Sequence, residues 1–258
     1  MDLGIRGKTA LVTAASGGMG RNIALALAAE GVNVALFARS RDKLQEIRLE
    51  IERKHSVRAV AIPGDMLVRK DVEQLALTME RELTNPDILV LLTGRPPNPI
   101  RATLDEVDEE RWQQAYQNQL WAAIQVTSRI LPLMTGRGWG RILAVTSASV
   151  KQPMPHHSLS TVFRAGVTAY MKHLANEVAA DGITVNCVAP ALIDTSHRVG
   201  TAAYTEAQSE ARKKLTPLGR MGTQEEFASV VAFLASVQAG FITGASIQVE
   251  GGMIGALL

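Results

Sequence analysis

The stretch TALVTAASGGMG, residues 9–20, decides the fold. It begins with the β-branched and apolar residues of an expected strand, Thr9–Thr13, and ends in a cluster of small residues around Ser16, Gly18 and Gly20. Small residues let a backbone approach a phosphate group, and the N-terminus of a following helix attracts one. We therefore predict the first strand–turn–helix unit of a dinucleotide-binding sheet, although a tight turn without a ligand gives the same pattern.

Short apolar runs and longer amphipathic stretches alternate to the end of the chain. The expected strands are Thr9–Thr13, Val32–Ala38, Val57–Ile62, Ile88–Leu92, Arg141–Thr146, Ile183–Val188 and Ile247–Val249. The expected helices are Met19–Glu30, Asp42–Lys54, Asp71–Leu83, Glu109–Met134, His157–Ala180, Glu206–Leu215 and Gln224–Ala235. This alternation predicts an α/β fold with a doubly wound, seven-stranded parallel sheet and helices on both faces. No linker interrupts the series, so residues 1–258 are expected to form a single domain.

Composition and charge exclude several function classes. The 27 basic residues nearly balance the 25 acidic ones, so no basic stripe for nucleic acid is expected. No apolar run reaches the roughly 20 residues of a membrane span. The single cysteine, Cys187, and a start without a signal-peptide profile favour a reducing, cytoplasmic location. The histidines show no metal-ligand spacing, and no metal is assigned.

The end of the second strand predicts which dinucleotide binds. It reads Phe37-Ala38-Arg39-Ser40-Arg41 and lacks the Asp or Glu that usually holds the ribose 2′-hydroxyl of NAD. Arginine suits a 2′-phosphate instead, so NADP(H) is preferred, with Arg39 and Ser40 as contacts, and NAD(H) remains possible. The alternative is a solvated helix start with incidental charges. After the third strand, Asp65 and Met66 are expected at the adenine, unless Asp65 is only a turn or cap residue.

The order of motifs resembles the short-chain dehydrogenase/reductase family over essentially the whole chain, especially the bacterial 3-oxoacyl-[acyl-carrier-protein] reductases. The matching segments are Thr13-Ala14-x3-Gly18-x-Gly20, Gly64-Asp65-Met66, Gly140-Arg141-Ile142, Gly182-Ile183-Thr184-Val185-Asn186-Cys187-Val188-Ala189-Pro190, Pro217-Leu218-Gly219-Arg220, Ile242-Thr243-Gly244 and Glu250-Gly251-Gly252. The resemblance implies a nicotinamide dinucleotide, a small-molecule substrate and a homo-oligomer, either a tetramer or a dimer. It also implies cofactor contacts from Thr13, Ser16, Gly18, Met19, Gly20, Gly94, Arg164, Pro190, Ile193 and Thr195.

The resemblance further locates a catalytic set that this chain alters. The family uses Asn, Ser, Tyr and Lys, with the Tyr thirteen residues after the Ser and the Lys four residues further on. Aligned on Gly140-Arg141-Ile142, the Ser is Ser147, the Tyr position holds Ser160 and the Lys position holds Arg164. The Asn position holds Gln119. These four are the candidate catalytic residues, and only the Ser is retained.

The replacements change the expected proton chemistry. In the family the Tyr phenol gives its proton to the substrate oxygen, whereas the Ser160 hydroxyl is too short to reach that position and is a poor acid. Arg164 can grip ribose hydroxyls or stabilise an oxyanion, but with a pKa above about 12 it donates no proton. Two proton routes stay open: solvent, through a water beside Ser160, or an imidazole of His156 or His157.

Three functions are compatible with these residues. The first is an NADP(H)-dependent reduction of a carbonyl or of a conjugated enone. For the enone, stabilisation of the enolate matters more than a strong acid. The second is a non-redox isomerisation or dehydration on the same scaffold, and the third is dinucleotide binding without turnover. We favour the first because Ser147, Pro190 and Thr195, which the resemblance places at the nicotinamide end, are kept.

Overall fold

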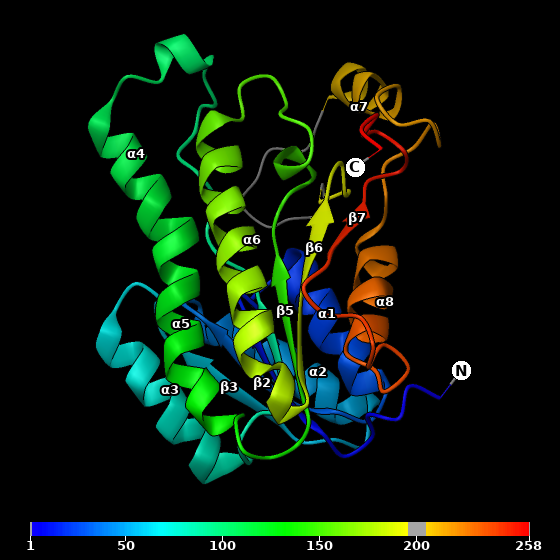
Figure 1. Cartoon of the computed structure of the whole chain (residues 1–258). Coiled ribbons are helices and arrows are strands. Elements are labelled where there is room, and N and C mark those ends of the chain that lie inside the picture. Colours follow the sequence, from blue (N-terminus) through cyan, green and yellow to red (C-terminus); the bar gives the residue numbers. More distant parts are fainter. Residues whose placement is uncertain (1, 196–204, 258) are drawn as a thin grey trace.

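A seven-stranded parallel sheet forms the centre of the protein (Figure 1). The computed structural model describes residues 2–195 and 205–257, and all seven strands lie in these ranges. They are β1 (Thr9–Thr13), β2 (Asn33–Ala38), β3 (Ala59–Pro63), β4 (Ile88–Leu91), β5 (Gly140–Val145), β6 (Ile183–Pro190) and β7 (Ser246–Val249). The ends of each strand lie within two residues of their predicted positions, and the predicted fold class is confirmed.

The strand order, β3-β2-β1-β4-β5-β6-β7, reverses direction between β1 and β4. β1 pairs with β2 on one side, where Val12 faces Leu36, and with β4 on the other, where Val12 faces Val90. The chain therefore crosses toward one edge of the sheet after β1 and toward the other edge after β4. Such a switch point leaves a crevice at the carboxyl ends of the strands, which is where ligands bind in open α/β sheets.

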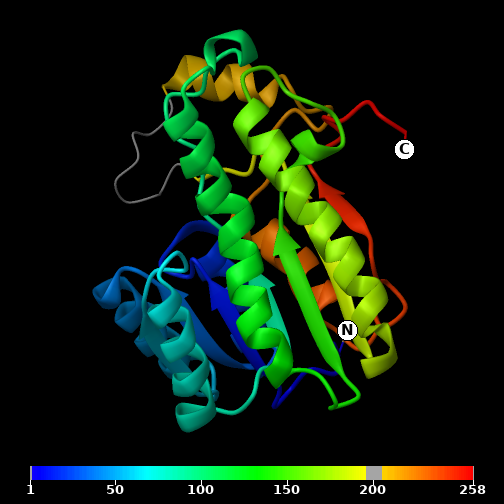
Figure 2. The same cartoon turned by 60° about the vertical axis from the view of Figure 1, so that its left-hand side comes forward.

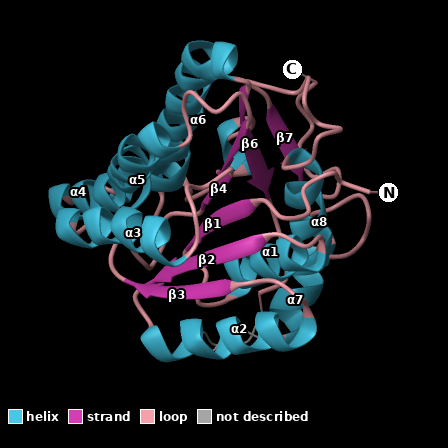
Figure 3. Ribbon diagram, turned by 90° about the horizontal axis from the view of Figure 1, so that it is seen from below, coloured by secondary structure: helices cyan, strands magenta, loops and turns pink. Residues whose placement is uncertain are grey.

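Helices cover both faces of the sheet (Figures 2 and 3). One face carries α1 (Gly18–Ala29), α2 (Arg41–Lys54) and α8 (Gln224–Leu234), and the other carries α3 (Arg69–Glu82), α5 (Ala122–Ile130) and α6 (Ser158–Val178). The remaining helices are α4 (Glu109–Ala115), α7 (Glu206–Lys213) and the short 3-10 turns η1 (Thr103–Asp105), η3 (Leu131–Leu133), η4 (Ala148–Val150) and η5 (Ala179–Asp181). None of the helices in the described ranges is long and apolar enough to cross a membrane.

Alternate residues of each strand build the two layers of the core. Val12 of β1 packs in the layer under α1, α2 and α8, and its neighbour Leu11 packs in the layer under α3, α5 and α6. Cys187 of β6 belongs to the second layer and is 2% exposed. Burial raises the pKa of its thiol to about 11, so the thiol is protonated at neutral pH.

The helix predicted over Glu109–Met134 contains a break in its hydrogen-bond pattern. α4 passes into a π turn, η2 (Tyr116–Trp121), before α5 continues. At this turn the carbonyl of Asn118 accepts a hydrogen bond of 2.9 Å from the N–H of Gly94, which follows β4. A π turn adds one residue to a helix and often marks a functional site. One added residue barely changes the apolar period, so the sequence predicts a continuous helix.

Candidate active site

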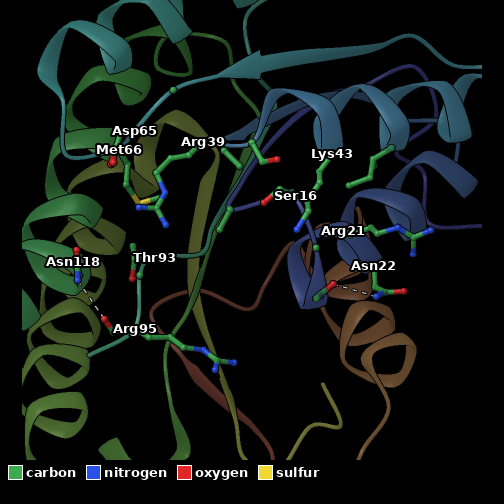
Figure 4. Close-up of a pocket in the computed structure, with 18 of the residues that line it drawn as sticks. Ser16, Arg21, Asn22, Arg39, Lys43, Asp65, Met66, Thr93, Arg95 and Asn118 are labelled. Atoms are coloured by element: carbon green, nitrogen blue, oxygen red, sulfur yellow. Dashed lines mark hydrogen bonds between the residues drawn. The ribbon is translucent and has the colours of Figure 1, made fainter. Parts of the chain in front are cut away.

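A cleft opens where the carboxyl ends of β1, β2, β3 and β4 meet the segments that follow them (Figure 4). Its volume is about 1050 Å³, at the upper end of the range for small-molecule sites. The predicted cofactor contacts that line it are Ser16, Gly18, Arg39, Ser40, Asp65, Met66 and Gly94. Lining residues that are not predicted as cofactor contacts include Ala14, Gly17, Arg21, Asn22, Lys43, Thr93, Arg95, Gln114, Asn118 and Gln224.

The turn between β1 and α1 allows a close backbone approach. Ala14 has a φ of 48° and Gly18 a φ of 55°, both in the left-handed region that favours glycine. A Cβ on Gly20 would lie 2.5 Å from the carbonyl oxygen of Ala14, so glycine there lets α1 pack against the turn. Gly17 and Gly18 line the cleft at the start of α1, where N–H groups without a helical partner favour a phosphate.

Thr13, Met19 and Gly20 are not among the residues that line the cleft, and their contact with the cofactor stays a prediction. Thr13 is fully buried, and its hydroxyl donates to the Leu92 carbonyl at 2.7 Å and accepts from the Leu92 N–H at 2.8 Å. Met19 packs against the core beside α1. Thr13 and Met19 therefore support the turn from its core side. A motif in the sequence does not show which way each of its residues faces.

Two cations face the cleft at the end of β2. Arg39 is exposed, and Lys43 lies four residues later in the first turn of α2. Figure 4 shows both side chains directed into the cleft, Lys43 toward Ser16. Neither cation has a hydrogen-bond or ion-pair partner among the described residues. Lys43 is not predicted from the sequence, and its position in the first turn of the helix that follows Arg39 is the signal that could have identified it.

Asp65 organises the turn after β3. Its Oδ1 accepts a hydrogen bond of 2.9 Å from the N–H of Leu67, and its own N–H donates to Oδ2 of Asp71 at 2.8 Å. The carbonyl of Met66 accepts a hydrogen bond of 2.6 Å from Nε2 of Gln125 in α5. Asp65 is thus a turn residue, and together with Met66 it also lines the cleft, as the adenine prediction requires.

Arg164 lies behind the end of β4. Its Nη1 donates to Oγ1 of Thr93 at 2.6 Å and to the Val145 carbonyl at 3.0 Å, and its Nη2 donates to the Gly94 carbonyl at 2.9 Å. It is 8% exposed and does not line the cleft, so the predicted grip on a ribose would require these bonds to be exchanged. Burial and the nearby charge of Arg95 lower the pKa of Arg164 to about 10, which keeps the guanidinium charged at neutral pH.

Ser147 lies just after β5 and caps the short turn η4. Its Oγ lies 2.9 Å from Oγ of Ser149 and accepts a hydrogen bond of 3.2 Å from the Ser149 N–H. Ser149 is fully buried, whereas Ser147 is half-buried. The contacts with Ser149 therefore orient the hydroxyl of a residue that is only half-buried.

A narrow recess lies beside Ser160 in the first turn of α6. Its volume is about 10 Å³, and it is lined by Pro96, Pro97, Ile100, Glu106, His156, His157, Leu159 and Ser160. This is room for about one water molecule. Nδ1 of His157 donates to the Pro155 carbonyl at 2.7 Å, which leaves Nε2 as the nitrogen that exchanges a proton.

Gln119 is fully buried and contacts Leu159 of α6, and its role as a catalytic residue stays a prediction. Its Nε2 donates to the carbonyls of Ala115 and Leu159, both at 3.4 Å. The neighbouring Asn118 lines the cleft instead, and its Nδ2 donates to the Arg95 carbonyl at 3.4 Å. Both residues belong to the π turn, where the side-chain directions depart from those of a regular helix.

Pro190, Ile193 and Thr195 lie at or beyond the end of β6. Ile193 is buried and forms a β-bridge with Gly222, while Pro190 and Thr195 are half-buried. None of the three lines the cleft, and the segment that follows them, residues 196–204, lies outside the described residues. Their contact with a nicotinamide stays a prediction.

Comparison with known proteins agrees with this geometry. The family profile described as enoyl-(acyl carrier protein) reductase matches residues 13–254. Nodulation protein G of Rhizobium sp. (strain N33) is 34% identical over 249 residues, 96% of this chain and 98% of that protein. The 3-oxoacyl-[acyl-carrier-protein] reductase of Aquifex aeolicus is 32% identical over 254 residues, 98% of this chain and 100% of that protein.

A solved structure shows the same likeness over the full length. The L-sorbose reductase of Gluconobacter frateurii, complexed with NADPH and L-sorbose, superimposes with a TM-score of 0.91 at 30% identity and 100% coverage of both chains. These matches agree with the structure, in which the cleft lies at the switch point of the sheet and beside a glycine-rich turn. The chain therefore belongs to the short-chain dehydrogenase/reductase family of NAD(P)-dependent oxidoreductases and resembles its 3-oxoacyl-[acyl-carrier-protein] reductases.

Proposed function

We propose that the protein uses NADP(H) to reduce a small carbonyl compound or a conjugated enone. The observation that carries the cofactor preference is the pair of cations, Arg39 and Lys43, that lines the cleft at the end of β2. A 2′-phosphate placed there meets two positive charges, whereas a bare ribose hydroxyl finds no acceptor carboxylate at the end of β2. The complex of the Gluconobacter frateurii L-sorbose reductase with NADPH supports the same preference.

The preference is tested by titrating the protein with NADPH and with NADH. Arg39→Asp and Lys43→Ala are each expected to weaken NADPH binding roughly 10- to 100-fold, because a hydrogen bond to a charged group contributes about 1.5–3 kcal/mol. NADH binding should change little. Arg41→Ala is the matched control, since Arg41 starts α2 but does not line the cleft. Equal effects on both dinucleotides, or none, would refute the 2′-phosphate role.

The bound cofactor supplies a hydride, and the chain has to stabilise the oxygen that becomes negative. The Ser147 hydroxyl, oriented by Ser149, donates a hydrogen bond to that oxygen. Arg164 contributes through its charge rather than through direct contact, because Thr93 and Gly94 separate it from the cleft and its hydrogen-bond partners among the described residues include no carboxylate. A cation at low dielectric favours an oxyanion or enolate nearby. Arg164 thus holds the segment after β4 in position and also acts on the substrate oxygen through its charge.

We propose that a water molecule in the recess beside Ser160 donates the proton that the reduced substrate takes up. The recess has room for about one water molecule. His157→Gln is then expected to leave kcat nearly unchanged, as is the control His156→Gln. A fall of about 100-fold in kcat in either variant would identify that histidine as the donor instead.

The reaction itself is tested with a panel of saturated ketones and enones, following the absorbance of NADPH. Oxidation of NADPH with enones alone indicates conjugate reduction, and oxidation with ketones indicates carbonyl reduction. Product formation without any change in NADPH would contradict the redox proposal.

A further inference from the structure

Arg95 is a cation of the cleft that the cofactor preference does not use. It follows Gly94 at the end of β4, is exposed, and lines the cleft. Figure 4 shows its side chain extending into the open middle of the cleft, between the helix that carries Asn118 and the start of α1. Within residues 2–195 and 205–257, its guanidinium forms no hydrogen bond or ion pair.

The backbone beneath Arg95 is held in place although the side chain is free. The carbonyl of Arg95 accepts a hydrogen bond of 3.4 Å from Asn118, and the N–H of Gly94 donates to the Asn118 carbonyl at 2.9 Å. Arg164 holds the Gly94 carbonyl and the Thr93 hydroxyl from behind. Support of this kind lowers the backbone entropy that the segment loses when it binds a ligand.

The charges around Arg95 are unbalanced. Arg164 lies close enough for Arg95 to lower its pKa, and no carboxylate is bonded to either guanidinium in the described part of the chain. The acidic residues of the cleft lie on its other walls: Glu46 on α2, Asp65 after β3 and Glu225 on α8. Among the other cations, Arg21 pairs with Glu50 at 2.5 Å.

We propose that Arg95 binds an anionic group, carboxylate or phosphoryl, of a ligand in the cleft. The planar guanidinium offers a fork of donors that matches both groups, and its donors are not engaged by any described residue. The anion has two possible sources, the pyrophosphate of the dinucleotide or a carboxylate on the substrate. The inference rests on the proposed function only in placing a dinucleotide and its substrate in this cleft.

The test uses Arg95→Gln, which removes the charge and keeps a polar side chain, and the matched control Arg129→Gln. Arg129 is an exposed residue of α5 that does not line the cleft. Both variants should unfold like the wild type, because both side chains are exposed. Binding of NADPH is measured by titration, and binding of acetoacetate and of its neutral methyl ester is measured with and without NADPH.

The two arms distinguish the sources of the anion. A loss of NADPH affinity of roughly 10- to 100-fold in Arg95→Gln assigns the pyrophosphate, and loss of a preference for acetoacetate over its ester assigns a substrate carboxylate. Unchanged affinities for both probes would overturn the inference while leaving NADPH binding, and hence the proposed function, intact. If the wild-type protein does not bind NADPH but binds acetoacetate through Arg95, the result would contradict the cofactor proposal alone.

Discussion

At the scale of the residue, Ala14 is strained because it occupies a conformation suited to glycine. Its φ of 48° costs a residue with a Cβ about 1–2 kcal/mol. Ala14→Gly removes this cost but adds about 0.5–1 kcal/mol of backbone entropy, so the free energy of unfolding should rise by roughly 0.5–1 kcal/mol. Urea denaturation measures the change. Ala15→Gly, at a buried position without positive φ, should lower the stability, and a loss of stability in Ala14→Gly would contradict the strain.

Individual site residues were predictable where a local pattern carries them. Ser16, Gly18 and Arg39 follow directly from their neighbours in the chain, and all three line the cleft. Arg164 illustrates the opposite case, since its hydrogen bond to Gly94 joins positions 70 residues apart. A motif identifies such a residue by its position but not by its partners, so the sequence does not show that Arg164 bonds to Thr93, Gly94 and Val145.

At the scale of the element, α8 begins with a capping box that includes an ion pair. The Thr223 hydroxyl accepts from the Glu226 N–H, and the Glu226 carboxylate accepts from the Thr223 N–H. Arg220 donates to both Glu226 oxygens, at 2.8 and 2.6 Å. The Arg220 hydrogen bonds, followed by that of the Thr223 backbone, lower the pKa of Glu226 from its usual 4.5 to about 2.

Glu226→Gln keeps the capping box and removes the charge, so it isolates the electrostatic part. Because the folded-state pKa is depressed, the ionised carboxylate stabilises the fold above pH 4.5, and that contribution is lost as the pH falls toward 2. Thermal unfolding at several pH values should show a variant less stable than the wild type at pH 7, with a difference that shrinks below pH 4.5. Glu225→Gln, the neighbour in the first turn, is the control, and a difference independent of pH would contradict the assignment.

Element types were easier to predict than their internal geometry. β-branched runs and amphipathic periods predict each strand to within two residues, because burial on a sheet or under a helix selects those patterns. The π turn at Tyr116–Trp121 has no such pattern, and it turns Asn118 rather than Gln119 toward the cleft. The contacts with Gly94 that accompany this turn depend on the distant end of β4.

At the scale of the whole molecule, Cys187 reports on the integrity of the sheet. It lies in β6 between β5 and β7, where it pairs with Ala144 and Ser246. With the thiol pKa raised to about 11, a thiol reagent at pH 8 should label the native protein only as fast as the sheet opens. Labelling followed by mass spectrometry should therefore show no modification of native protein over minutes and one equivalent in urea. Rapid labelling of the native state would contradict the burial.

The burial of Cys187 also has a consequence for protein engineering. The chain contains one cysteine, and it is closed to solvent. A cysteine introduced at an exposed position such as Ser229 of α8 would be the one thiol open to a maleimide in the folded protein. A dye or a surface tether can thus be attached at a chosen point of the native sequence, without first replacing the cysteine that the sheet encloses.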